Sequence, residues 1–172
     1  MKSILTFVFL IVFIAAKLNG QSCLPNGIVF TSQYAIDNFS ITYPDCTQIT
    51  GDVIINGSSI TNLNGLSQLI SINGNVDIVA NPLLNNLNGL SNLSSIGGYF
   101  DINSNSSLSS ISGLSSLTSV GFYFSIFNNP DLLTLNGIEN LTYVGSTFVI
   151  QENESLTDIS AISSIINLVS TL

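Results

Sequence analysis

The chain has 172 residues; 45 % are hydrophobic and only 7 % are charged, with ten acidic residues, two Lys, no Arg and no His. This composition is too apolar for a disordered chain, and its length suits one domain. Both cations, Lys2 and Lys17, precede position 20. The remainder cannot neutralise phosphates, which argues against binding to nucleic acid or to anionic lipid. It also lacks the usual general base, Schiff-base amine and Arg clamp, so we expect no enzyme and no cofactor.

The N-terminus has the layout of a secretory signal peptide, which we place at residues 1–20. A basic start, Met1 to Ser3, precedes a run from Ile4 to Ala16 that is apolar except for Thr6, and Gly20 stands before the polar remainder. The alternative is an uncleaved anchor, but this thirteen-residue run falls short of the about 20 residues that span a bilayer as a helix. We therefore expect cleavage near Gly20, no membrane insertion afterwards, and a location outside the cell or on its surface.

Two cysteines, Cys23 and Cys46, follow the expected cleavage site. An even count in an exported chain predicts a disulfide, which would stabilise the fold by roughly 3 kcal/mol on the chain-entropy estimate. Two free thiols are the alternative, and two thiols without His are too few for a metal site. Thr31 or Ser32 could cap a short helix between the cysteines, and we interpret residues 21–48 as a cap over the first repeat.

A repeat with a 24-residue period fills residues 49–172. Its columns are Ile72, Ile96, Val120 and Val144; Leu69, Leu93, Leu117 and Leu141; Leu84, Leu108, Leu132 and Leu156; Gly65, Gly89, Gly113 and Gly137; and Asn81, Asn105, Asn129 and Asn153. Alternating apolar residues predict short half-buried strands at 53–55, 76–78, 100–102, 124–126 and 148–150. One repeat cannot bury its apolar face alone, so we expect the copies to stack and their strands to pair in parallel.

Two polar or small columns have expected structural roles. The Asn column should turn inward at the strand ends, where its amides satisfy backbone groups that a tight coil leaves unpaired. The Gly column fits a positive φ or close packing. The fold expected is all-β: a right-handed parallel β-solenoid of about five 24-residue coils, similar to leucine-rich repeats, with a disulfide-linked N-terminal cap.

The repeat, with the head segments Cys23 to Ile28 and Tyr43 to Cys46, resembles the receptor L domain, a leucine-rich single-stranded β-helix of receptor ectodomains. It is more similar still to secreted bacterial surface proteins of this type, over about residues 23–166. The resemblance implies an extracellular recognition or scaffold role and supplies no catalytic residues. Relatives often continue beyond the position that corresponds to Leu172, so the resemblance also suggests a short or truncated member.

The exposed strand face is the first candidate binding site. Tyr99 and Tyr123 share one column, Asp77 and Asp101 share the next, and Phe127 lies one column on. Aromatic rings beside carboxylates suit contact with a protein or a glycan; alternatively, the tyrosines only cover a polar sheet and stabilise neighbouring coils. Two carboxylates are too few to predict a Ca²⁺ site. Their expected place on an open ladder argues against a glycosidase pair.

Two functions from different classes stay open. The first is a secreted or cell-surface binding or adhesion module that recognises an extracellular protein or glycan through the strand face. The second is a passive structural surface protein, including an ice-binding variant suggested by the column Ser94, Thr118 and Thr142. The apolar C-terminus, from Ile159 to Leu172, leaves a further choice: self-association through an open last coil, or a cap formed by residues 163–172 folding back as a short helix.

Overall fold

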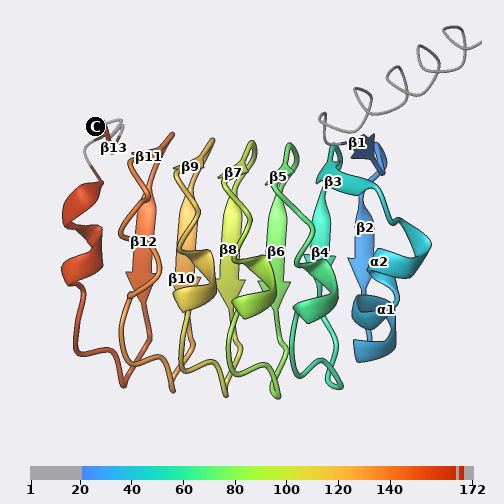
Figure 1. The fold of residues 1–172 in the computed structure, drawn as a ribbon. Helices are drawn as coiled ribbons and strands as arrows, with labels where there is room; N and C mark the ends of the chain where they lie inside the picture. Colours follow the sequence, from blue (N-terminus) through green and yellow to red (C-terminus); the bar gives the residue numbers. More distant parts are fainter. Residues whose placement is uncertain (1–20, 166, 169–172) are drawn as a thin grey trace, which may run out of the picture.

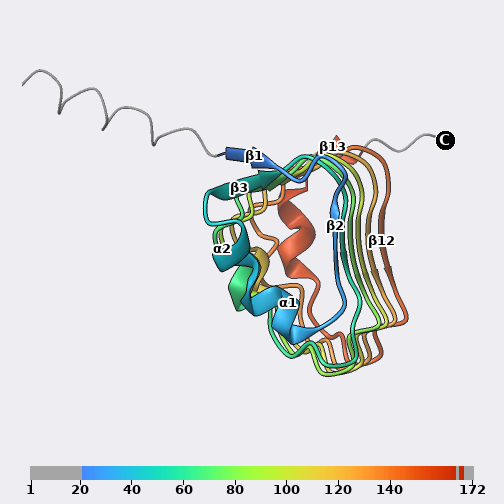
Figure 2. The ribbon, with the colours of Figure 1, turned by 90° about the vertical axis from the view of Figure 1, so that its right-hand side faces the viewer.

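The computed structural model describes residues 21–165, 167 and 168, which form two parallel sheets side by side. Sheet A has seven strands in the order β1-β3-β5-β7-β9-β11-β13, and sheet B has six in the order β2-β4-β6-β8-β10-β12. From β3 onward, each repeat therefore adds one strand to each sheet. Figure 1 shows the stacked strands from the side, and Figure 2 looks along the stack, where successive coils superimpose. This arrangement is consistent with the expected β-solenoid; the signal peptide expected at residues 1–20 lies outside the described residues.

Sheet B contains the five strands that the alternation predicts and one more from the cap. They are β2 (Ile28–Phe30), β4 (Val53–Ile55), β6 (Val76–Val79), β8 (Phe100–Asn103), β10 (Phe124–Phe127) and β12 (Phe148–Gln151). Inward residues of β8 and β10 are fully buried, while their outward neighbours are partly exposed. From β6 to β12 each residue pairs with the one 24 positions later, so Phe124 stacks between Phe100 and Phe148 with ring centroids 4.9 Å apart on both sides.

Sheet A and a row of 3₁₀ turns complete each coil. The strands are β1 (Gln21–Cys23), β3 (Cys46–Ile49), β5 (Ser71–Ile72), β7 (Ser95–Ile96), β9 (Ser119–Val120), β11 (Tyr143–Val144) and β13 (Asn167–Leu168). The turns are η1 (Asn64–Leu66), η2 (Asn88–Leu90), η3 (Ser112–Leu114) and η4 (Ser160–Ser164). In Figure 2 the turns lie opposite sheet B, and the repeated Leu and Ile side chains fill the space between them as one core.

The Gly column marks a close approach between coils. A Cβ atom on Gly89 would collide with the carbonyl oxygen of Leu63, and one on Gly113 with that of Leu87. In this column only Gly137 has a positive φ, 119°. Close packing is therefore the main reason for glycine here, the second of the two roles expected from the sequence.

The Asn column forms a ladder inside the coil. Asn81, Asn105 and Asn129 are fully buried. The Asn129 amide oxygen accepts the backbone N–H of Asn105 at 3.1 Å, and its Nδ2 donates to the carbonyl of Ile102 at 3.0 Å and to Oδ1 of Asn153 at 3.3 Å. Asn153, the last member, is only partly buried, against the full burial expected.

A left-handed turn precedes each of these asparagines. The turn residues are Ala80, Ser104, Asn128 and Glu152, whose φ values are 55°, 57°, 53° and 55°. Non-glycine residues rarely adopt this conformation, so its recurrence every 24 residues shows that the coil requires it. The turn ends the strand and directs the following side chain inward, which is how the Asn ladder is formed.

The cap continues the stack as well as covering it. Helix α1 (Gln33–Asp37) begins after Ser32, whose Oγ accepts the N–H of Ala35 at 3.3 Å, and α2 (Phe39–Thr42) follows. The Phe39 ring packs edge-on against Phe30 of β2, with centroids 5.7 Å apart, and both are buried. Because β1 and β2 extend both sheets, the first repeat meets a paired strand on each side rather than a helix alone.

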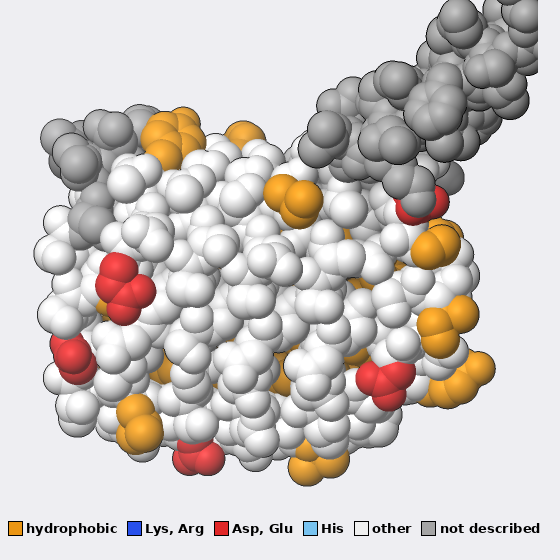
Figure 3. Space-filling model, in the orientation of Figure 1, with side chains coloured by type: hydrophobic (Ala, Val, Ile, Leu, Met, Phe, Trp, Pro, Cys, Tyr) orange, Lys and Arg blue, Asp and Glu red, His pale blue; other side chains and the backbone are white. Residues whose placement is uncertain are grey.

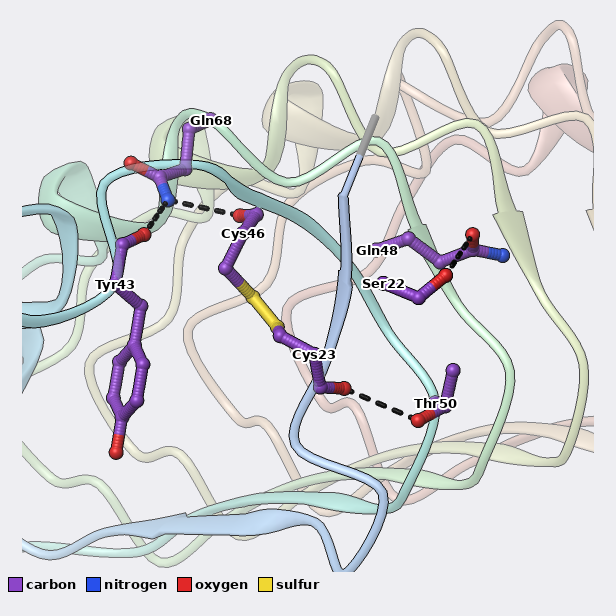
Figure 4. Close-up of a disulfide and its surroundings, with 7 residues drawn as sticks. All are labelled: Ser22, Cys23, Tyr43, Cys46, Gln48, Thr50 and Gln68. Carbon is purple, nitrogen blue, oxygen red and sulfur yellow. Dashed lines mark hydrogen bonds between the residues drawn. A yellow bond between two sulfur atoms is a disulfide. The ribbon is translucent and has the colours of Figure 1, made fainter. Parts of the chain in front are cut away.

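A disulfide between Cys23 of β1 and Cys46 of β3 ties the cap to the first coil (Figure 4). Gln68 donates from Nε2 to the carbonyls of Tyr43 at 2.6 Å and Cys46 at 2.8 Å, and Thr50 donates from Oγ1 to the carbonyl of Cys23 at 3.1 Å. The disulfide prediction is confirmed, and these hydrogen bonds connect both of its cysteines to the repeats.

Candidate functional site

The outer face of sheet B carries the residues that the sequence selects for binding. We call them the outer patch: Tyr99, Tyr123, Asp77, Asp101 and Phe127. Asp77 of β6 pairs in register with Asp101 of β8, and Phe127 of β10 pairs with Asn103. Each tyrosine stands one position before the first buried residue of its strand. The tyrosines and aspartates meet at the N-terminal ends of these strands, and Phe127 lies at the other end.

The two tyrosines form a rigid stack that a carboxylate anchors. Their rings are nearly parallel, with an interplanar angle of 5° and centroids 4.7 Å apart. Tyr99 donates its hydroxyl to Oδ2 of Asp77 at 2.9 Å. Tyr123 is 37 % exposed, and only its partner Tyr99 is held by the carboxylate. Tyr123 is therefore the ring that a ligand can cover.

Partial burial and neighbouring acids shift the pKa values at this site. Burial raises the pKa of Asp77 above its ordinary value; the Tyr99 hydrogen bond opposes this shift, and the charges of Asp101 and Asp52 add to it. Burial and then the hydrogen bond to Asp77 raise the pKa of Tyr99 to about 12. Burial also raises the pKa of Tyr123, with smaller effects from Asp101 and Asp77. The outer patch therefore favours the neutral forms of Asp77, Tyr99 and Tyr123, as a site without a counter-ion does.

Asp101 is the more available of the two carboxylates. Its Oδ2 accepts one long hydrogen bond, 3.5 Å, from Nδ2 of Asn103. An ionised carboxylate has about four acceptor positions, so most of those on Asp101 can serve a ligand. Asp77, by contrast, already accepts the Tyr99 hydroxyl.

Asp52 belongs to the same acidic region, although the sequence analysis did not select it. It stands one position before β4, and its Oδ1 accepts the backbone N–H of Asn75 at 2.7 Å. Asn75 in turn accepts the N–H of Tyr99 at 3.1 Å through its own Oδ1. Asp52, Asn75 and Tyr99 thus form one column. The first repeat is one residue shorter than the others, so a strict 24-residue spacing does not place Asp52 in the column of Asn75 and Tyr99.

The chemistry available among the described residues is limited to carboxylates, amides, hydroxyls and aromatic rings. Residues 21–172 contain no Lys, Arg or His. Within the described part of the chain, no group of three or more His, Cys, Asp or Glu is placed to hold a metal ion. Over residues 21–165 and 167–168, no helix is long and apolar enough to cross a membrane. Figure 3 shows the side that carries the 3₁₀ turns, where scattered acids interrupt a largely uncharged polar surface.

The Ser/Thr column beside sheet A uses its hydroxyls within the fold. Ser94, Thr118 and Thr142 donate to carbonyls of the preceding coil, those of Ile70, Ser94 and Thr118, at 2.9, 2.9 and 3.3 Å. These contacts fasten neighbouring coils to one another. The column therefore has a structural task that requires no external ligand.

The model of one protein family, Receptor L domain, matches residues 45–165. The chain belongs to the receptor L domain family. The match includes residues 49–165 of the repeats and the whole outer patch, and it leaves residues 21–44 of the cap outside. No match is found among curated proteins or among solved structures. The family suggests a ligand-binding extracellular module, and both the family and the disulfide are consistent with an extracellular location.

Proposed function

We propose that this receptor L domain is a secreted or cell-surface, non-enzymatic binding or adhesion module that recognises an extracellular protein or glycan through the outer face of sheet B. The observation that carries the proposal is the outer patch. Its tyrosines are stacked at 4.7 Å and Tyr99 is hydrogen-bonded to Asp77, so they offer aromatic surface at a small cost in conformational entropy. Asp101 and Asn103 beside them supply hydrogen-bond acceptors and donors for specificity.

The non-enzymatic part of the proposal is supported by the residue types present. Proton transfer or covalent catalysis needs an activated nucleophile, a base or an electrophile held in a site that excludes water. Beyond position 20 the chain has no imidazole, amine or guanidinium. The Asp77–Asp101 pair lies on the outer side of a sheet, where each acid borders the next along the ladder.

Export and chain organisation are part of the same proposal. Residues 1–20 act as a signal peptide, residues 21–48 as the cap and residues 49–172 as the repeats. The coil is right-handed, because parallel strands of one sheet are almost always joined by right-handed crossovers. A relationship to secreted bacterial members of the family rests on the sequence resemblance alone.

A passive structural role, including ice binding, is the second candidate. The hydrogen bonds of the Ser94, Thr118 and Thr142 hydroxyls favour a purely structural column over an ice-binding one, since their donors already serve the fold. This candidate assigns the tyrosine stack to stability alone. It therefore predicts that no ligand depends on Tyr123.

The experiment compares two faces of the same protein. The protein beginning at Gln21 is screened against panels of extracellular proteins and glycans, as wild type, Tyr123→Ser and Thr142→Ala. The proposal predicts a ligand whose affinity falls about tenfold or more with Tyr123→Ser, as at interface hot spots, and stays unchanged with Thr142→Ala. Melting temperatures of the three proteins control for folding. Equal losses in both variants would contradict a site on the outer face of sheet B, and the absence of any ligand would support the passive role instead.

A further inference from the structure

We infer that the partner of the outer patch is a basic protein segment, with an Arg or Lys side chain that covers Tyr123 and pairs with Asp101. The inference rests on the proposed function and names the partner class for the same face. Three features support it: the charge balance of the chain, the geometry of the stacked rings, and the spare acceptor positions on Asp101.

The charge balance leaves the acids of this face without a cationic side chain of the same chain to pair with. All ten carboxylates of the chain lie beyond position 20, where no cationic side chain exists. Asp52, Asp77 and Asp101 stand on three successive coils, and the first and third both act on the second through charge repulsion. Since neighbouring strands are about 4.8 Å apart, Asp77 and Asp101 form a row along the stack, and Asp52 stands on the preceding coil in the Tyr99 column. A cation bound beside the row would offset the repulsion that the fold leaves uncompensated.

The ring geometry suits a cation whose charged group is planar or is carried on an extended aliphatic chain. A cation binds an aromatic ring through its face, within about 6 Å of the centroid. Tyr99 covers one face of Tyr123, and Tyr123 remains 37 % exposed. Asp101 pairs in register with Ser125, two residues after Tyr123, so ring and carboxylate lie on the outer face of neighbouring coils, where one extended ligand can contact both. A guanidinium can stack on the ring and donate to the carboxylate at the same time.

Other ligand classes use less of this surface. A neutral glycan could stack on Tyr123 and donate its hydroxyls to Asp101, but it would not offset the negative charge of carboxylates on three successive coils. A metal ion would find only two carboxylates in register, one of them already bonded to Tyr99. A basic segment is the one class that uses the ring, the free carboxylate and the charge of the row together.

The test uses two synthetic peptides and matched variants of the protein. The first peptide is acetylated, amidated and carries Arg at alternate positions; the second carries citrulline there, which keeps the shape of Arg and removes its charge. Fluorescence anisotropy measures binding of each peptide to wild type, Asp101→Asn, Tyr123→Ser and Asp131→Asn. Asp131 is an exposed acid in a turn outside sheet B, so its variant reproduces the change in net charge. Neutral oligosaccharides and CaCl₂ are added in parallel titrations.

We expect the Arg peptide to bind and the citrulline peptide to bind at least about fivefold more weakly, with about threefold losses in Asp101→Asn and in Tyr123→Ser. Asp131→Asn should change the affinity by less than about 1.5-fold, and the preference for Arg should shrink at 1 M salt, where the Debye length is about 3 Å. Equal losses with Asp131→Asn and Asp101→Asn would mean attraction by net charge alone and would overturn the inference. Binding of an oligosaccharide, or Ca²⁺ affinity that depends on Asp101, without a preference for Arg would also overturn it while leaving the proposed function intact. If no probe depends on Tyr123, both fail.

Discussion

Replacing Asn129 by Ala should be among the most destabilising single changes outside the apolar core. The side chain is fully buried, and its amide makes five hydrogen bonds, to Asn105 N, Asn105 Nδ2, Ile102 O, Phe127 O and Asn153 Oδ1. The substitution leaves the buried N–H of Asn105 without its acceptor and the carbonyl of Ile102 without this donor. At roughly 1–3 kcal/mol for each orphaned group, the free energy of unfolding should fall by about 3–5 kcal/mol.

Urea denaturation followed by circular dichroism measures this loss, with Asn153→Ala and Asn136→Ala as comparisons. Asn153 is the partly exposed end of the ladder, so water can replace some of its partners and its loss should be smaller, about 1–2 kcal/mol. Asn136 is exposed in a turn, and its change should stay within about 0.5 kcal/mol. If Asn129→Ala cost no more than Asn136→Ala, the ladder would not stabilise the coil and the reasoning would be refuted.

Four further outcomes follow from burial and charge. Leu108→Ala, at a fully buried position, should cost about 2–5 kcal/mol, whereas Tyr123→Ser should cost less than about 1 kcal/mol; equal shifts in melting temperature would contradict the assignment of faces. Reducing the disulfide should lower stability by roughly 3 kcal/mol, and alkylation without reductant should find no free thiol. Folding raises the pKa of Asp77 above 3.8 and so disfavours its charged form. Asp77→Asn should therefore be more stable than wild type at pH 7, and the difference in unfolding free energy should close as pH falls to about 3.8 and below. A difference that does not change with pH would count against the raised pKa. Because the pKa of Tyr99 is about 12, the stability that its protonated hydroxyl contributes should be present below pH 10 and lost as pH rises through 12. Tyr99→Phe should therefore remove a phenol that ionises near pH 12 from an absorbance titration, and an unchanged curve would argue otherwise.

The sequence predicts the strands of sheet B and the buried columns because each depends on a short periodic pattern. Phe100 and Ile102 alternate with polar neighbours, and Leu108 recurs at a constant spacing of 24 residues. Stacked copies of one unit must place equivalent residues at equivalent positions of the coil. Many columns with the same spacing therefore fix the register in which neighbouring strands pair. The Asn ladder was predictable for a related reason, since a recurring amide at the end of a strand needs buried partners.

Other elements leave no such pattern. A strand of two residues, such as Ser119–Val120 in sheet A, is too short for alternation, and its pairing depends on the neighbouring coils. The left-handed turns occupy Ala80, Ser104, Asn128 and Glu152, which share no side-chain property, so only the backbone reveals them. The strands contributed by the cap, β1 and β2, precede the repeat and have no column to join. At the candidate site, the columns placed the tyrosines and aspartates near one another, but the Tyr99–Asp77 hydrogen bond depends on side-chain conformation.

The expected role of the C-terminal segment stays a prediction. Ile165 packs against the core, and β13 pairs with β11, but residues 166 and 169–172 lie outside the described residues. Residues 167 and 168 form a strand of sheet A, so they do not belong to the short fold-back helix expected over residues 163–172. Self-association through the last coil stays a prediction. Light scattering of the purified protein at high concentration tests it: an oligomer supports the open end, and a monomer supports a covered last coil.

Photo-crosslinking on living cells tests the central claim most directly, that this domain binds its partner through the outer face of sheet B. A photoreactive phenylalanine replaces Ser125 on the outer face of β10 in one protein, and Ser119 on β9 of sheet A in a second. The account predicts a discrete crosslinked product from position 125 that disappears when Tyr123→Ser is added, and none from position 119. Equal products from both positions, or a product at 125 that survives Tyr123→Ser, would contradict it.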